Sequence, residues 1–162
     1  MPLLAQRLPN PYRPFLPGFR SPLYLHLRPL WLGLEHALAT CSGRVLDIGC
    51  GVQPYRPMLG AGVTEYVGVD RPGDLSRPTC YAAAEHLPFP DESFDVVLST
   101  QVLEHVVDPR VALQEAMRVL RPGGRAVITI PGTWPTHEAP YDFWRFTHPS
   151  RVTMTETSSS IM

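Results

Sequence analysis

Residues 44–70 read RVLDIGCGVQPYRPMLGAGVTEYVGVD, and this stretch decides the fold. It begins with an apolar, β-branched run (VLDI) that predicts a short buried strand. Gly49 and Gly51 follow in a turn where a ligand can approach the backbone, and Pro54 has the φ that suits the first position of a helix. A second strand ends in Asp70, about 20 residues past the glycines, a spacing that places a carboxylate beside a ribose. Strand, glycine turn, helix, strand and acid together indicate one half of a nucleotide-binding βαβ unit.

The chain beyond this stretch keeps alternating between strands and helices. Residues 79–83 predict a weak third strand, and 94–100 (FDVVLST) predict a fourth that is apolar on both faces. Asp108 can cap a helix that has proline at its first position and runs to about Leu120. A fifth strand is predicted over 125–130. This order predicts an α/β fold, a Rossmann-like parallel sheet with helices on both faces.

The two ends of the chain differ from this middle part. Residues 1–28 are rich in proline and arginine and predict an irregular segment, while 29–149 form the domain and begin with an amphipathic helix. Residues 150–162 are polar and rich in Ser and Thr, which predicts a disordered tail. The fifth strand would then be an exposed edge through which the chain could self-associate.

Composition limits the function classes. A chain of 162 residues fits one domain, and a net charge of −1 gives no global sign of nucleic acid or of an acidic membrane surface as a partner. The three cysteines, Cys41, Cys50 and Cys80, lack metal-ligand spacing, so we expect reduced thiols and no metal site. We see no signal peptide, because no uninterrupted apolar core follows a charged start. We expect no membrane span either, since the apolar region 23–39 is interrupted by Arg28, Pro29 and Glu35. We expect a cytoplasmic protein.

The glycine turn alone leaves the ligand open, because dinucleotide enzymes, flavoproteins and methyl donors all use one. In a dinucleotide site a third glycine allows close helix–strand contact, and a helix N-terminus faces the pyrophosphate. Pro54 stands at the position of that glycine here. This substitution counts against a pyrophosphate ligand but not against S-adenosylmethionine, which has no phosphate.

Four sequence blocks carry a more specific resemblance: VLDIGCG, YVGVD, AEHLPFPDESFDVVLSTQVLEHVVDP and EAMRVLRPGGRAVITIPG. In this order and at these intervals they resemble the class I S-adenosylmethionine-dependent methyltransferases, in particular the methyltransferase type 11 group. The resemblance covers about residues 44–147. It implies S-adenosylmethionine as cofactor and a seven-stranded sheet, of which only five strands are predicted here, so we expect the last two to be lacking.

The resemblance also implies a cofactor site at the carboxyl ends of the strands. Asp47 would act on the cofactor ammonium, often through water, Asp70 would accept hydrogen bonds from both ribose hydroxyls, and Arg71 would lie beside the adenine. The other cofactor-binding residues that it implies are Gly49, Cys50, Gly51, Ala84, Glu85, Thr100 and Gln101.

Two positions in this set need comment. Cys50 occupies a place where the family tolerates small residues, so we interpret it as a packing residue rather than a nucleophile. Relatives commonly have Asp-Ala-Glu where this chain has Ala83-Ala84-Glu85, so a carboxylate contact to the adenine amino group is missing. Backbone groups around Ala84 and Glu85 would then have to hold the base.

Two histidines are candidate catalytic bases, because a base with a pKa near 7 assists transfer to a hydroxyl. His105 follows the fourth strand, and His137 lies in a loop that also contains Tyr141, Trp144 and Arg145. If the acceptor is an amine or an activated carbon, neither histidine needs to act as a base.

The function that these observations favour is methyl transfer to a small-molecule acceptor, by O- or N-methylation. The first alternative is a truncated or inactive S-adenosylmethionine-binding remnant, favoured by the absent last strands and by Ala83. The second is an NAD-dependent oxidoreductase, which Pro54 disfavours.

Overall fold

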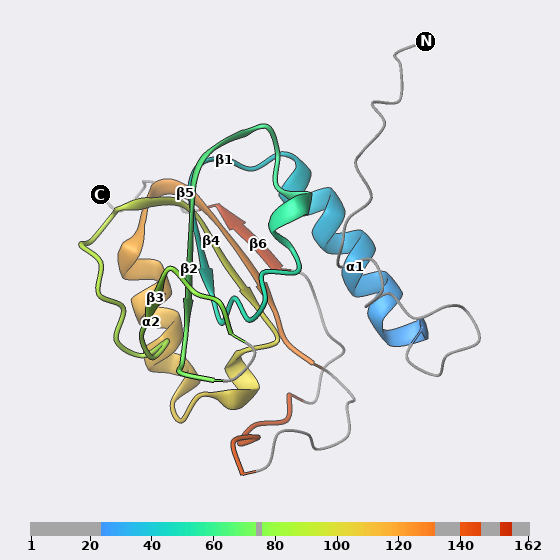
Figure 1. Ribbon diagram of the computed structural model, residues 1–162, viewed down its shortest axis with the longest axis vertical. Helices are drawn as coiled ribbons and strands as arrows, with labels where there is room; N and C mark the ends of the chain where they lie inside the picture. The colour runs from blue at the N-terminus through green and yellow to red at the C-terminus, as the bar shows by residue number, and fades with distance from the viewer. Residues whose placement is uncertain (1–23, 74–75, 132–139, 147–152, 157–162) are drawn as a thin grey trace.

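The computed structural model describes residues 24–73, 76–131, 140–146 and 153–156. In this part of the chain one sheet has the strand order β3-β2-β1-β4-β5-β6 (Figure 1). Its strands are β1 (Ser42–Ile48), β2 (Gly62–Asp70), β3 (Cys80–Tyr81), β4 (Phe94–Thr100), β5 (Leu120–Thr129) and β6 (Thr153–Glu156). The first five strands pair in parallel, and β6 runs antiparallel to β5. The parallel order 3-2-1-4-5 is that of a Rossmann-like sheet.

Helices cover both faces of this sheet, as the sequence predicted. The two α-helices are α1 (Tyr24–Ala39) and α2 (Pro109–Val119), and two short 3₁₀ helices are η2 (Arg56–Met58) and η3 (Leu103–His105). Figure 1 shows α1 and α2 on opposite sides of the strands. Among the described residues, no helix is both long and apolar enough to cross a membrane.

Strand β1 lies at the centre and is fixed from both sides. Val45 belongs to an apolar cluster with Leu34 and Leu38 of α1, whereas Leu46 belongs to a second cluster with Ala116 of α2. Both β1 side chains are fully buried. Each such burial stabilises the fold by about 1.5–3 kcal/mol. The end of β1, where the glycine turn begins, is therefore held by the core.

Helix α2 begins where the sequence predicted. The Asp108 carboxylate accepts a hydrogen bond from the backbone N–H of Arg110 at 2.9 Å, and Pro109 is the first helical residue. The next strand starts earlier than predicted, because β5 follows the helix directly at Leu120. A register irregularity near Gly123, whose φ is +76°, allows the chain to pass from helix to strand without a separate loop.

Helix α1 is longer at its start than the sequence predicted. It begins at Tyr24 and contains Pro29, where the prediction began the helix. A proline inside a helix removes one backbone hydrogen bond. The packing of Leu30 and Trp31 against the apolar cluster on this face of the sheet compensates for that loss. Residues 24–28 are thus helical, and the rest of the predicted irregular segment lies outside the described residues.

The helix predicted after Pro54 is wrong. Between β1 and β2 the chain forms turns and only the three residues of η2, which contains Pro57. Gly60 then donates a hydrogen bond to the Leu38 carbonyl at 2.9 Å, and a Cβ at Gly60 would lie 2.5 Å from the carbonyl oxygen of Ala39. A second proline and this close approach to the end of α1 leave too little chain for an α-helix.

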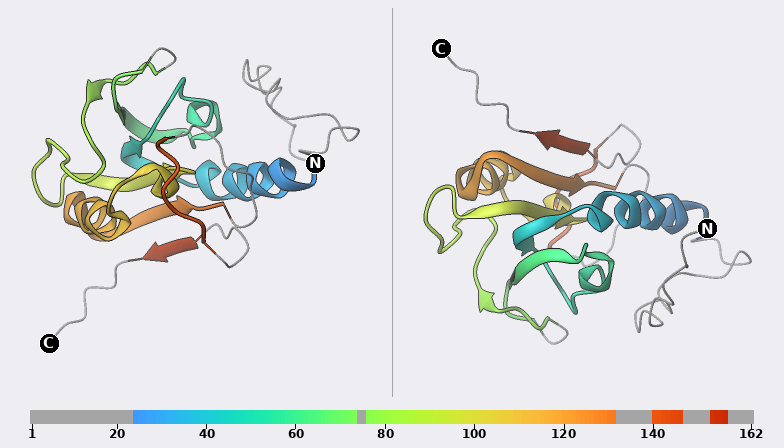
Figure 2. Two further views of the ribbon diagram at one scale, coloured as in Figure 1. Left: turned by 90° about the horizontal axis from the view of Figure 1, so that it is seen from below. Right: turned by 90° about the horizontal axis from the view of Figure 1, so that it is seen from above.

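The exposed edge predicted for the fifth strand is also wrong. Residues 153–156, predicted to be disordered, form β6 and pair with 125–128 of β5 (Figure 2). The alternating threonines of this segment suit a strand, although it lacks the apolar pattern on which the prediction relied. The sheet thus has a sixth strand, which the prediction lacked, and self-association through an open β5 loses its basis.

Candidate functional site: the cavity at the strand ends

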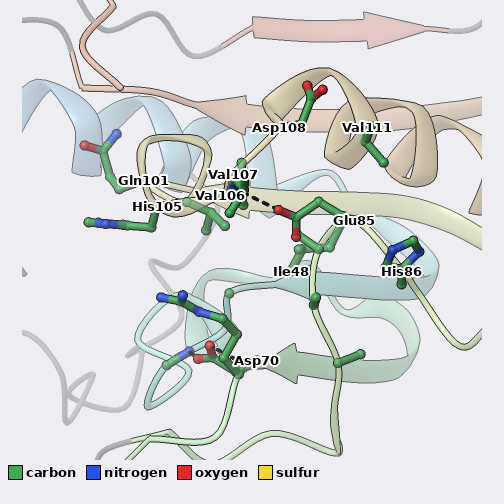
Figure 3. Close-up of a pocket in the computed structure, with 17 residues that line it drawn as sticks. Ile48, Asp70, Glu85, His86, Gln101, His105, Val106, Val107, Asp108 and Val111 are labelled. Atoms are coloured by element: carbon green, nitrogen blue, oxygen red, sulfur yellow. Dashed lines mark hydrogen bonds between the residues drawn. The ribbon is translucent and has the colours of Figure 1, made fainter. Parts of the chain in front are cut away.

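Three parallel strands end at the same level of the sheet. Ile48 of β1 is paired with Val69 of β2 on one side and with Ser99 of β4 on the other. The residues that follow these three therefore meet at one edge of the sheet, where α/β folds bind ligands. A cavity of about 840 Å³ lies at this edge, and we call it the strand-end cavity (Figure 3).

The glycine turn forms the floor of the cavity. The backbone N–H groups of Gly49 and Cys50 both donate to the Val69 carbonyl, at 2.8 and 3.1 Å. Gly49 and Gly51 have φ values of +70° and +51°, which favour glycine. A Cβ at Gly49 would lie 2.3 Å from Val102, while a Cβ at Gly51 would meet nothing within 4 Å. Gly51 therefore presents bare backbone beside open space.

Asp70 is held in a fixed orientation on the wall next to this turn. Its Oδ2 accepts a hydrogen bond from the Gly51 N–H at 2.8 Å, and its Oδ1 accepts one from the Arg71 N–H at 2.7 Å. A carboxylate has about four lone-pair positions, so each oxygen can accept one further hydrogen bond. Asp70 can thus bind a pair of neighbouring hydroxyl groups.

Glu85 lies on the facing wall (Figure 3). Its Oε1 accepts a hydrogen bond from the backbone N–H of Val107 at 3.0 Å, which ties residues 82–86 to the segment after η3. Ala83 and Ala84 also line the cavity on this side, and their side chains carry no polar group. This wall offers backbone groups, the Glu85 carboxylate and His86 to a ligand.

Asp47 lies behind the glycine turn and does not line the cavity. Its carboxyl group is 1% exposed and accepts a hydrogen bond from the Tyr66 hydroxyl at 2.5 Å. Burial raises its pKa to about 7, against the lowering effect of the Tyr66 hydrogen bond. Cys50 is also buried behind the turn, and desolvation raises the pKa of its thiol to about 12, so the group stays protonated at neutral pH.

The end of β4 contains a strained residue that the sequence did not reveal. Gln101 has φ +56°, a conformation that is uncommon for residues other than glycine and that clusters at functional sites. Its backbone N–H donates to the Thr129 carbonyl at 3.1 Å, and its side-chain amide donates to the Thr129 hydroxyl at 3.2 Å. These bonds hold Gln101 at the cavity, while Thr100 is buried beneath it, its hydroxyl without a hydrogen-bond partner among the described residues.

His105 borders the cavity from η3 and is fixed by a distant part of the chain. Its Nδ1 lies 2.8 Å from the Tyr141 carbonyl oxygen, which can only accept, so Nδ1 carries the proton. Its Nε2 lies 3.9 Å from Oε1 of the fully buried Glu104. Both ring nitrogens thus have neighbours within the protein.

The structure brings most of the predicted cofactor residues together. Those that line the cavity, with the candidate base, are Gly49, Gly51, Asp70, Arg71, Ala84, Glu85, Gln101 and His105. Asp47, Cys50 and Thr100 lie behind the wall, and His137 is outside the described residues. The prediction did not include the apolar part of the wall, formed by Ile48, Val102, Val106, Val107 and Val111. In the sequence, the only sign of this apolar wall is the recurrence of valine at positions 102, 106, 107 and 111.

Known proteins resemble this chain in sequence and in fold. A family model described as a methyltransferase domain, type 11, matches residues 46–128. The demethylmenaquinone methyltransferase of Clavibacter sepedonicus is 36% identical over 113 residues, covering 61% of this chain and 46% of that protein. The 2-methyl-6-phytyl-1,4-hydroquinone methyltransferase of Synechocystis is 32% identical over 134 residues, covering 75% of this chain and 42% of that protein.

The fold comparison agrees with these matches. The crystal structure of the YcgJ protein from Bacillus subtilis has a TM-score of 0.57 and 30% identity, covering 67% of this chain and 52% of that one. This chain spans about half the length of the curated relatives that it matches. The matched residues run from β1 into β5 and include the glycine turn, Asp70 and the facing wall. The chain therefore belongs to the methyltransferase type 11 family of class I S-adenosylmethionine-dependent methyltransferases.

Proposed function

We propose that this chain binds S-adenosylmethionine in the strand-end cavity and transfers its methyl group to a small-molecule acceptor by O- or N-methylation. The observation that carries this proposal is the pairing of Asp70 with Gly51. A carboxylate with lone pairs left for a diol stands next to bare backbone and open space. A ribose and a close-lying amino-acid chain suit these two features.

Charge supports a cationic ligand. Asp70 and Glu85 lie on facing walls (Figure 3). Asp47 is buried behind the turn. Carboxylates in a partly enclosed cavity favour a sulfonium and an ammonium over a phosphate. The connection between β1 and β2 also lacks the helix whose N-terminus would face a pyrophosphate, since η2 has only three residues. These features disfavour NAD.

Each wall would have its own part in binding. Gly49 and Gly51 would let the backbone contact the methionine end, with Asp47 acting on its ammonium through water. Asp70 would hold the ribose, and Arg71 would lie beside the adenine. Ala84 and Glu85 would support the base from the facing wall, where Ala83 supplies no carboxylate.

When bound, the cofactor supplies an electrophilic methyl group, so the protein has mainly to orient the acceptor and exclude water. Orientation of two reactants can provide about 7–11 kcal/mol of a barrier. Gln101 and His105 stand beside the cavity where the acceptor would approach. With Nδ1 holding its proton for Tyr141, His105 could accept a proton from a hydroxyl only at Nε2.

The names of the relatives suggest where to look for the acceptor. Two of them are methyltransferases of demethylmenaquinone and of a phytylated hydroquinone. We therefore include prenylated quinols among the acceptors to be tested, besides hydroxyl- and amine-bearing metabolites. Transfer to ring carbon would leave His105 without a role as a base.

A second candidate function is binding of the cofactor without methyl transfer. The observation that favours it is Ala83, because the carboxylate that the family resemblance implies near the adenine is absent from this wall. Binding and transfer must therefore be measured separately.

Calorimetry with S-adenosylhomocysteine and with NAD tests the binding step. We expect the first to bind and the second not to bind, and Asp70→Asn to weaken binding at least tenfold, because an amide lacks the charge that strengthens hydrogen bonds to the ribose. Absence of binding by the unmodified chain, or preference for NAD, would contradict the proposal. Turnover on the acceptor panel then separates an active enzyme from a binding protein.

A further inference from the structure

Residues 140–146 connect two sides of the strand-end cavity, and we call this segment the strap. It lies at the end of the molecule where β1, β2 and β4 finish (Figure 1). On one side it is bonded to η3 and the residues that follow it. On the other it reaches Arg71, which follows β2 and lines the cavity.

The backbone of the strap is fixed by several hydrogen bonds on the η3 side. The Glu104 carbonyl accepts from the backbone N–H of Phe143 at 2.8 Å and from that of Trp144 at 3.3 Å. The Trp144 indole N–H donates to the Val106 carbonyl at 3.0 Å. With the His105–Tyr141 bond, these contacts hold the strap against one wall of the cavity.

Tyr141 extends from this fixed backbone to the opposite wall. The guanidinium carbon of Arg71 lies 5.2 Å from the centre of the Tyr141 ring, within the range of a cation–π contact. The ring also contacts Phe143 edge to face, with centroids 6.5 Å apart. Tyr141 itself is 54% exposed, so burial in the core does not explain its position.

We propose that Tyr141 is a cofactor-positioning residue, which holds the Arg71 guanidinium over the adenosyl end of the cavity and slows escape of the ligand. This inference rests on the proposed function, because Arg71 is placed beside the adenine there. The Tyr141–Arg71 contact joins a residue after β2 to one anchored on η3, so it connects two walls of the cavity. Tyr141 acts through Arg71 rather than on the reacting atoms.

The position of the Tyr141–Arg71 contact predicts which ligands it affects. S-adenosylmethionine and S-adenosylhomocysteine share the adenosyl group and differ at the sulfur. Loss of the Tyr141 ring should therefore speed the dissociation of both by the same factor. An exposed cation–π contact corresponds to a change of about two- to fivefold.

The test compares Tyr141→Ala with Tyr141→Phe by stopped-flow dissociation of both ligands. We expect Tyr141→Ala to dissociate them about two- to fivefold faster and Tyr141→Phe to match the unmodified chain, because phenylalanine keeps the ring. Arg71→Gln should speed dissociation at least as much, because it also removes the guanidinium beside the adenine, and Tyr141→Ala should add nothing further in that background. Tyr81→Ala serves as the matched control, since Tyr81 is 59% exposed and does not line the cavity.

The outcomes separate the two proposals. Failure of the unmodified chain to bind S-adenosylhomocysteine would defeat the proposed function. If it binds but Tyr141→Ala dissociates at the original rate, the inference on Tyr141 is overturned and the proposed function stands. Equal acceleration in Tyr141→Phe, or acceleration of only one of the two ligands, would also overturn it. If Tyr141→Ala does not fold, Tyr141→Leu decides by the same criteria, because leucine also lacks the aromatic ring.

Discussion

The Tyr66 hydroxyl lies 2.5 Å from Oδ2 of Asp47 and donates a hydrogen bond to it beneath the glycine turn. The two residues come from neighbouring strands, β2 and β1, and Asp47 is 1% exposed. A buried carboxyl group with one hydrogen-bond donor is a costly place for a negative charge. The protonation state of Asp47 in this pair therefore affects the stability of the fold.

The first prediction concerns the pH dependence of that stability. The pKa of Asp47 rises from 3.8 to about 7 on folding, so the folded state retains a proton that the unfolded state releases. The contribution of Asp47 to the free energy of unfolding is present below pH 4. It falls by up to about 4 kcal/mol as pH rises toward 7. Asp47→Asn should remove this loss, and urea unfolding at pH 5 and pH 8 measures it.

Tyr66→Phe provides the matching control for Asp47. Removal of the hydroxyl takes away the hydrogen bond that favours the charged carboxylate, so the pKa of Asp47 should rise further. The variant should lose more free energy of unfolding at pH 8 than at pH 5. Equal losses at both pH values would show that Asp47 does not titrate as described.

The second prediction separates the two glycines of the turn. Gly49→Ala combines a φ of +70° with a Cβ 2.3 Å from Val102, so it should lower the free energy of unfolding by about 2–5 kcal/mol. Gly51→Ala meets open space and should cost only about 1–2 kcal/mol, for its φ of +51°. Its methyl group would enter the ligand space, so S-adenosylhomocysteine should bind at least tenfold more weakly by calorimetry. If Gly51→Ala binds S-adenosylhomocysteine with unchanged affinity, the ligand does not lie against the turn.

The third prediction concerns Arg118, which supports the cavity wall from α2. Its guanidinium bonds Glu115 at 2.7 and 2.8 Å and donates to the Leu87 and Phe89 carbonyls at 3.1 and 2.8 Å. Lysine cannot reproduce this planar set of donors, so Arg118→Lys should lower the free energy of unfolding at pH 7. Arg110→Lys, on the same helix and 87% exposed at its side chain, should change it little.

The Arg118–Glu115 pair makes the stability of the fold depend on pH with a sign opposite to that of Asp47. Hydrogen bonds from Arg118 lower the pKa of Glu115 from 4.5 to about 2. Its contribution to stability is therefore present above pH 4.5 and is lost as pH falls toward 2. In Arg118→Lys this loss on acidification should be smaller, and denaturant titrations at pH 2.5 and pH 6 would measure it. An unchanged acid dependence would argue against the bond between these residues.

The sequence predicted those secondary-structure elements that depend on residues close together in the chain. The apolar run FDVVLST gave β4 with its observed bounds, and Asp108 with its following proline gave the start of α2. The false helix after Pro54 has a different origin. A proline marks where a helix can begin, but the close packing of Gly60 on the end of α1 decides that none fits. Such a contact between distant residues leaves no trace in a window of sequence.

The same limit applies to β6 and to the site. Residues 153–156 form a strand because β5 offers them backbone partners, whereas their own composition suggested disorder. Motif spacing placed Gly49, Gly51 and Asp70 on one cavity, because strand ends of a parallel sheet converge. Tyr141 was only one aromatic residue in a loop until the fold brought it to Arg71. Contacts between loops and distant walls require the tertiary structure.

The last prediction concerns Ala83, the departure from the family pattern on the cavity wall. Residue 83 is one of those that line the cavity, and the family resemblance implies a carboxylate at this position. Ala83→Asp should therefore restore an acceptor for the adenine amino group and tighten binding of S-adenosylhomocysteine about tenfold, the effect of one hydrogen bond to a charged group. Calorimetry measures the change, and Ala83→Asn separates the effect of charge from that of size. If Ala83→Asp binds more weakly than the unmodified chain, the adenine lies elsewhere and the assignment of this wall fails. If Ala83→Asp binds S-adenosylhomocysteine more tightly and also raises turnover, the activity of this chain is limited by the missing carboxylate rather than by the acceptor side of the site.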